Sequence, residues 1–334
     1  MTAAPAVTPA VRARTSWFAR GGWPSFLARR LGVFALSLWG LVTAAFLMLQ
    51  LIPGDPVRMA VGLNASVEVV EAMRAHLGLD LPLWEQYTRF IGGLLTGNPG
   101  DSIKLHIPVV QVIADRLPAT LELALLTIVV VLLLAVPIGI AFAALTRGGR
   151  RRGVEIGYTA TSGIFAVIPE FLFGVGLVYL FAVTVPVLPV AGRTGPESYI
   201  LPVAALALGG IASLSRIVRA EALGVLDADY IRTARAKRMP TALLYLRHAL
   251  PNLLTPTLTM AGLMLGSLIA GTVLVESIFA WPGLGQTLVS SITGKDYPLA
   301  QTLVVVYGGM VLLVNLIVDI VLALVDPRST IKEV

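Results

Sequence analysis

The sequence predicts an all-α integral membrane protein with six transmembrane helices, both termini in the cytoplasm and a large extracytoplasmic loop after the first helix. Its 334 residues have a mean hydropathy of +0.84, and only 13% of them are charged, whereas a soluble domain carries about 25%. Six apolar runs approach or exceed the roughly 20 residues that cross a bilayer core of about 30 Å. The basic residues gather in alternate connections, which indicates the orientation.

The first apolar run is Leu31–Ile52. It follows residues 1–30, a basic tail rich in Ala, Pro and Thr that is predicted to be disordered. The run is longer than the roughly 7–15 apolar residues of a secretory signal, so it is predicted to remain as the first span. The other runs are Leu123–Leu145, Gly157–Val183, Ser198–Ser215, Asn252–Val275 and Pro298–Val318. With their connections they form a predicted core over residues 118–328, followed by a second tail, residues 329–334.

Eighteen of the 25 Lys and Arg residues lie in the N-terminal tail, after the second run, in residues 216–251 or at the C-terminus. Short cytoplasmic connections carry such an excess, so all four segments are predicted to be cytoplasmic. The net charge of +6 is therefore a topology signal, and no nucleic-acid partner is predicted. The chain has no cysteine, and its three histidines lie far apart. No catalytic or metal centre is predicted.

Residues 53–117 form the large extracytoplasmic loop. Two stretches in it are predicted to be helical: one begins after Ser66, a potential cap, and ends at Gly78, and the other begins at Pro82. The loop either packs as an interfacial lid on the ends of the spans or offers an outer surface to a protein that delivers solute.

A charged insert, Asp227–Asn252, separates the fourth and fifth runs. Asp229 is predicted to cap a helix from Tyr230 to Arg238, which Pro240 stops. Three basic residues crowd one side of this helix, and three other residues share another side; the two sets are Arg232, Arg235 and Arg238, and Tyr230, Ile231 and Ala234. A second helix is predicted from Thr241, with an apolar stripe at Leu243, Leu246 and Leu250, ended by Pro251. The insert is either a basic loop that touches anionic lipid or a docking element for a cytosolic partner.

The insert resembles the EAA loop of permease subunits of binding-protein-dependent ABC importers, in the dipeptide, oligopeptide and nickel branch. Leu250 and Pro251 match the Leu-Pro of that pattern, and Ala234 matches its second Ala. Further matching segments follow in order: LIPGDPV at 51–57, HLGLDLPLWEQY at 76–87, TLELA at 120–124, IPEFLFG at 168–174, FAWPGLG at 279–285, DYPLAQ at 296–301 and LVDPR at 324–328. The resemblance runs from about residue 31 to 328.

The resemblance implies a subunit without catalytic activity in the cell membrane of a prokaryote. It implies a second homologous permease, two cytosolic ATPase subunits and an extracytoplasmic substrate-binding protein as partners, with the insert seated in a groove of an ATPase. The solute would be a di- or oligopeptide, or alternatively nickel or another small solute. The chain binds no cofactor of its own, because Asp296 stands where a Walker A motif after Gly294-Lys295 needs Ser or Thr. A secondary transporter is the less favoured alternative, since the halves show no evident repeat.

Two residues depart from the family pattern. Arg238 occupies the position of a Gly that permits a positive φ, so the turn is predicted to move to Met239-Pro240. His248 occupies the position of an apolar residue.

Four acidic residues lie in or beside the spans: Glu122, Glu170, Glu276 and Asp319. A carboxylate at membrane depth usually faces protein or water. Glu170, after the kink-forming Pro169, either stabilises the kink or attracts the ammonium end of a peptide in the solute pathway. Glu276 is a second possible pathway group, although its place near the outer end favours a structural role, as it does for Glu122. Asp319 is predicted to anchor a contact between helices, and Gly262 and Gly266 to allow close helix packing within the subunit or against a second permease.

Overall fold

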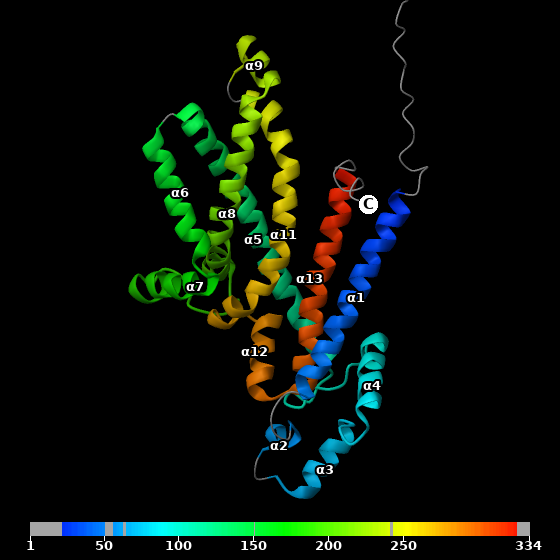
Figure 1. Ribbon diagram of the computed structural model, residues 1–334. Coiled ribbons are helices and arrows are strands. Elements are labelled where there is room, and N and C mark those ends of the chain that lie inside the picture. The colour runs from blue at the N-terminus through cyan, green and yellow to red at the C-terminus, as the bar shows by residue number, and fades with distance from the viewer. Residues whose placement is uncertain (1–21, 51–55, 63–64, 150, 241–242, 326–334) are drawn as a thin grey trace, which may run out of the picture.

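The computed structural model describes residues 22–50, 56–62, 65–149, 151–240 and 243–325, and every regular element in these segments is a helix (Figure 1). Five helical segments are long and apolar enough to cross a membrane: Trp23–Met48, Val109–Gly149, Pro196–Asp227, Pro256–Ile278 and Tyr297–Leu324. A sixth span is counted if the bent pair Arg152–Val167 and Glu170–Thr184 is taken as one. The all-helical class is therefore confirmed, and the number of spans depends on this bent pair.

The first helix, α1 (Gly22–Gln50), begins well before the expected Leu31. The apolar pattern continues upstream, and Phe26 is buried. Arg30 Nη1 lies 2.9 Å from Asp319 Oδ2 of α13, so a cation within the helix is neutralised by the last span. The predicted tail is thus shorter than residues 1–30, and residues 1–21 and 51–55 lie outside the described part of the chain.

Three short helices follow in the large loop: α2 (Pro56–Val61), α3 (Val67–His76) and α4 (Leu83–Thr96). The last of them packs on the end of α1, where the Tyr87 ring lies 5.3 Å from that of Phe46 and its hydroxyl lies 2.7 Å from Thr43 Oγ1. This part of the loop therefore packs on a span end, as an interfacial lid would.

The main core lies between α5 (Val109–Thr146) and α8 (Ile200–Asp227), both longer than the apolar runs that predicted them. A Cβ at Gly139 of α5 would lie 2.6 Å from the carbonyl oxygen of Ser215, so the two backbones touch and only glycine fits. Buried Leu123, Leu206 and Leu214 belong to the core cluster that α5 and α8 share. The close-packed helices α5 and α8 therefore form a rigid frame that supports the segments attached to their ends.

The third apolar run, Gly157–Val183, is not one straight helix. α6 (Arg152–Val167) and α7 (Glu170–Val178) meet at 94°, and α7 lies across the other helices (Figure 1). Ile168 is extended, with φ −69° and ψ 123°, because the residue before a proline avoids the helical region. The expected kink at Pro169 is thus a right-angled break.

The C-terminal part consists of α11 (Leu250–Ile278), α12 (Leu284–Gly294) and α13 (Tyr297–Val325). A Cβ at Gly262 would lie 2.7 Å from Val318 Cγ2, and one at Gly266 would lie 3.0 Å from Asn315 Oδ1. Both glycines therefore face α13, so the close packing is inside this subunit.

Candidate functional site

The insert forms α9 (Asp229–Ala236), which caps the joined ends of α8 and α11 and projects beyond them (Figure 1). Ile231 is fully buried and Ala234 is 6% exposed, in a cluster that includes Leu226 of α8 and Leu253 of α11. These apolar contacts join α9 to both long helices. A displacement of α9 is therefore transmitted to two spans, because packed elements move as units.

The other face of α9 is open. Arg232 and Arg235 are exposed, and Tyr230, which was expected beside Ile231 and Ala234, is 44% exposed. Asp229 does not cap the helix: Ala228 occupies the cap position, and Asp229 lies in the first turn, 3.4 Å from Arg232. A carboxylate there interacts favourably with the helix dipole without serving as a cap.

The turn after α9 stays at Arg238, so the expected shift to Met239-Pro240 is wrong. Arg238 has φ +53°, its N–H donates to the Arg235 carbonyl at 2.9 Å, and the Met239 N–H donates to the Ala234 carbonyl at 3.3 Å. This pair of bonds is the Schellman arrangement that ends helices. Arg238 accepts the left-handed conformation, which costs about 1–2 kcal/mol without glycine, because the two bonds satisfy the last carbonyls.

The second helix of the insert differs from its prediction. Residues 241 and 242 lie outside the described part, and Leu244–Ala249 form a π-helical turn that runs directly into α11. Leu244 and Ala249 are buried, whereas two residues of the expected stripe, Leu243 and Leu246, are 41% and 66% exposed, and the third, Leu250, is only partly buried. The open surface of the insert is thus partly apolar.

Pro251 does not end this helix. It lies in the first turn of α11, where a missing N–H is tolerated. His248 is half-buried, and its carbonyl accepts a hydrogen bond of 2.7 Å from Asn252 Nδ2. The last part of the insert, Leu244–Ala249, and the fifth span are consequently one continuous helical element.

Two arginine contacts brace the helix ends beside α9. Arg147 Nη2 lies 2.7 Å from Asp227 Oδ1, which joins the ends of α5 and α8. Arg219 binds Glu155 of α6 at 2.6 Å and Thr146 of α5 at 2.9 Å. Burial raises the pKa of Tyr245, partly opposed by the charge of Arg147. The base under α9 is therefore held by charge as well as by apolar packing.

Glu170 lies at the break between α6 and α7, as the first residue of α7. It is partly buried, and a Cβ at Gly271 of α11 would lie 3.9 Å from its carboxyl carbon. Among the described residues, none forms a hydrogen bond or ion pair with its side chain. A carboxylate without a partner in a broken span is suited to a ligand or to another subunit.

Glu276, the second possible pathway group, has a different environment. It is fully buried, and its carboxylate accepts hydrogen bonds from Thr120 Oγ1 at 2.7 Å and from the N–H groups of Gly285 and Gln286 at 2.7 and 3.2 Å. Its carboxylate therefore joins α5, α11 and the start of α12. The segment FAWPGLG, between α11 and α12, contains no signal that predicts this network from sequence.

Two further acidic residues, Glu122 and Asp296, have partners in the structure. Glu122 lies 2.6 Å from Arg193 Nη2 and accepts a hydrogen bond of 3.0 Å from the Tyr199 hydroxyl. Asp296 is buried and accepts hydrogen bonds from the Ser102 hydroxyl and from the N–H groups of Ile103 and Lys104. In the sequence, Asp296 was considered only as the residue that departs from a Walker A motif, and nothing there indicated this structural role.

Comparisons with known proteins agree with this architecture. The relatives include the glutathione transport system permease protein GsiC of Pectobacterium atrosepticum, which is 39% identical over 92% of this chain and 99% of its own length. They also include the dipeptide transport system permease protein DppB of Escherichia coli K12, 34% identical over 92% of this chain and 99% of its own length. Among solved structures, a chain of the inward-facing MetNI methionine ABC transporter matches 65% of this chain and 97% of its own length, with a TM-score of 0.54 and 20% identity, and so shows a shared fold.

Two family descriptions match in succession. Residues 24–124 match the N-terminal part of a binding-protein-dependent transport system membrane component, and residues 135–331 match the inner membrane component itself. The resemblance drawn from the sequence is thereby confirmed. The chain belongs to the family of binding-protein-dependent transport system inner membrane components, and it is a permease subunit of an ABC importer.

Proposed function

We propose that this permease forms half of the solute pathway of an ATP-driven peptide importer in a prokaryotic cell membrane. It pairs with a second homologous permease, while two cytosolic ATPase subunits supply ATP hydrolysis and an extracytoplasmic binding protein delivers the solute. The observation that carries the proposal is α9, whose buried face is fixed to α8 and α11 and whose other face exposes Tyr230, Arg232 and Arg235.

Both termini and α9 lie in the cytoplasm in this proposal. The support is the excess of basic residues at these ends of the helices, with Arg147, Arg219, Arg232 and Arg235 all at or near the α9 end. The large loop with α2, α3 and α4 lies at the opposite end of the molecule (Figure 1) and is then extracytoplasmic. The positive-inside rule gives the direction.

The coupling step follows from the contacts of α9. Its exposed Tyr230, Arg232 and Arg235, together with exposed Leu246, offer a mixed apolar and cationic surface to a groove of an ATPase. When the two ATPases close on ATP, they displace α9. The displacement reaches α8 and α11 through Ile231 and Ala234, because these side chains leave no free space for α9 to slide.

Peptides are the favoured solutes, because the relatives described above are named as glutathione and dipeptide permeases. Glu170 would attract the ammonium end of a peptide as it passes the broken span. Its partial burial lowers the local dielectric and strengthens that attraction, whereas solvated carboxylates interact weakly.

The test is reconstitution of the permease pair with its ATPases and binding protein in proteoliposomes. Uptake and ATP hydrolysis are measured with di- and oligopeptides, glutathione and Ni²⁺. Peptide-dependent ATP hydrolysis with uptake of the same peptide supports the proposal. Uptake of Ni²⁺ alone contradicts the peptide assignment, and uptake that proceeds without the ATPases contradicts the importer mechanism.

A further inference from the structure

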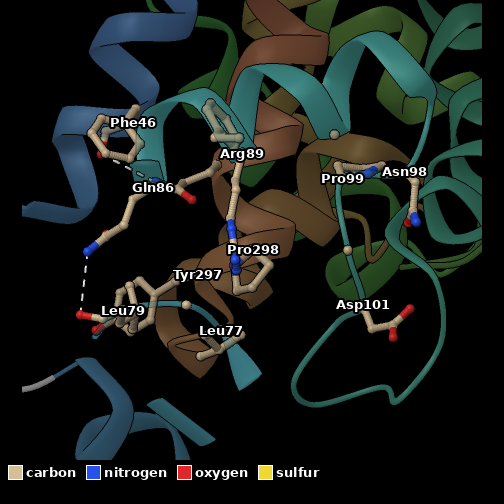
Figure 2. A pocket seen from close by; sticks show the side chains of 15 residues that line it. Phe46, Leu77, Leu79, Gln86, Arg89, Asn98, Pro99, Asp101, Tyr297 and Pro298 are labelled. Carbon is tan, nitrogen blue, oxygen red and sulfur yellow. Dashed lines mark hydrogen bonds between the residues drawn. The ribbon is translucent and has the colours of Figure 1, made fainter. Parts of the chain in front are cut away.

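A cavity of about 400 Å³ lies between α4, the following loop and the start of α13 (Figure 2). These elements lie far from α9 (Figure 1). The walls of the cavity are partly polar and partly apolar, and the apolar residues include Phe46, Leu77, Phe90 and Pro298. Its size lies in the range of about 300–1,000 Å³ that holds small molecules. The cavity is therefore a candidate ligand site distinct from the proposed pathway.

Two hydrogen-bond donors in this cavity have no partner among the residues that the structure describes. Figure 2 shows the Arg89 side chain running from α4 toward Tyr297 and Pro298. No described residue forms an ion pair or hydrogen bond with the Arg89 guanidinium. Tyr297 is 8% exposed and lines the cavity, and its hydroxyl likewise bonds to no group in the described segments. The Arg89 side chain is exposed, so its guanidinium is accessible to a ligand in the cavity.

None of the other described polar groups of the cavity pairs with Arg89, although Asp101 also lines it. The Gln86 amide donates to the carbonyl of Leu81 at 2.8 Å and is therefore already engaged. Asp101 and Asn98 lie on the far side of the cavity and stand apart from Arg89 (Figure 2). The cavity therefore offers a cation and a hydroxyl donor next to apolar walls.

We propose that this cavity binds a small carboxylate that carries an apolar group, such as the C-terminal end of a short peptide. The planar guanidinium of Arg89 matches a carboxylate through two parallel hydrogen bonds, and the Tyr297 hydroxyl supplies a third donor. The rings of Phe46 and Phe90, whose centroids are 6.2 Å apart, receive the apolar group. The ligand would connect α4 to the start of α13. This inference goes beyond the proposed function and does not depend on transport.

The test measures binding to the full chain in nanodiscs of phosphatidylcholine, without ATPases or binding protein. The probes are the dipeptide Ala-Phe and its C-terminal amide, titrated by calorimetry. The acid is expected to bind at least about 10-fold more tightly than the amide, because hydrogen bonds to charged groups contribute about 1.5–3 kcal/mol. Equal binding of acid and amide overturns the proposal.

Variants locate the site. Arg89→Gln is expected to weaken binding of the acid about 10- to 100-fold, and Tyr297→Phe, which keeps the ring, about 2- to 10-fold. Arg58→Gln removes an exposed arginine of α2 outside the cavity and should leave binding unchanged. Unchanged binding in both Arg89→Gln and Tyr297→Phe overturns the proposal.

Other oxyanions and a protein ligand are tested separately. Inorganic phosphate and nanodiscs with phosphatidylglycerol should compete only weakly with the dipeptide. If phosphatidylglycerol abolishes dipeptide binding through Arg89, or if only an intact binding protein engages Arg89, the small-carboxylate assignment is overturned. Since this assay contains no ATPase, a failure of the proposed importer activity leaves its result interpretable.

Discussion

Ala234→Asp tests whether α9 is a rigid coupling element. Ala234 is 6% exposed and belongs to a buried apolar cluster with Ile231, Leu244 and Leu253. A carboxylate placed there loses its hydration without gaining a partner, which costs about 3–5 kcal/mol. Burial of Ile231 stabilises the docked helix by only about 1.5–3 kcal/mol. The cost of burying the carboxylate exceeds the stabilisation from Ile231. We therefore expect α9 to detach from α8 and α11 while the spans stay folded.

The assay has two readouts in proteoliposomes. Limited trypsin digestion without ATPases should cut at Arg232 or Arg235 much faster in Ala234→Asp than in the wild type. With ATPases and binding protein, the variant should lose peptide uptake, together with ATPase binding or with the stimulation of ATP hydrolysis by peptide. Ala236→Asp, on the exposed side of the same helix, is the matched control and should leave the trypsin rate without ATPases unchanged.

Arg232→Gln separates shape from charge. Its side chain is 69% exposed, and such exposed pairs contribute about 0–1 kcal/mol, so the loss of coupling should be small and sensitive to salt. If Ala234→Asp couples normally with a wild-type trypsin rate while Arg232→Gln does not couple, then the insert is an electrostatic tether and the rigid-element reasoning is wrong.

Arg238→Gly should raise the Tm of the purified complex with uptake unchanged, since glycine relieves the left-handed conformation; a lower Tm would show that Arg238 contributes more by its side chain. Glu170→Gln should leave assembly and basal ATP hydrolysis intact but reduce uptake of peptides with a free ammonium end, and equal loss for N-acetylated peptides would contradict the proposed contact. Gly262→Leu should lower the Tm, because its Cβ would meet α13 at 2.7 Å; an unchanged Tm would refute that packing. Reporter fusions should read cytoplasmic at Arg235 and extracytoplasmic at Lys295, and the reverse would remove the basis for ATPase docking.

Hydropathy alone located the long helices, because a span needs a run of apolar residues whatever its neighbours are. Their ends were less predictable. Arg29 and Arg30 suggested a tail, yet Asp319 neutralises Arg30 inside α1. Hydropathy also does not indicate the angle between two helical segments. Pro169 therefore predicted a kink but not the 94° break.

The insert shows how one local change misplaces a buried face. Spacing for an α-helix selected Leu243, Leu246 and Leu250, whereas the π-helical turn buries Leu244 and Ala249, five residues apart. A π-helix bonds each N–H to the fifth preceding residue, so its face advances by more residues per turn. The sequence pattern could not distinguish the two geometries.

Glu276 was beyond sequence reasoning for another reason. Its donors come from Thr120, far upstream, and from the two N–H groups that begin α12. Only the packing of α5 against α11 brings these groups together, and neither spacing nor composition records that contact. The family pattern identified the segment FAWPGLG that follows Glu276, but it did not indicate the role of the Glu276 carboxylate.

The pairing of α1 with α13 has a consequence for biogenesis. Besides the Arg30–Asp319 ion pair, Gln301 Nε2 donates to the Ala45 carbonyl at 3.2 Å, and a Cβ at Gly308 would lie 2.5 Å from Leu41 Cδ2. The first span to be synthesised, α1, therefore lacks these contacts until the last span, α13, has been synthesised. Until α13 is inserted, Arg30 remains uncompensated in the nascent chain, and premature termination before α13 leaves a quality-control protease an unpaired first helix to recognise.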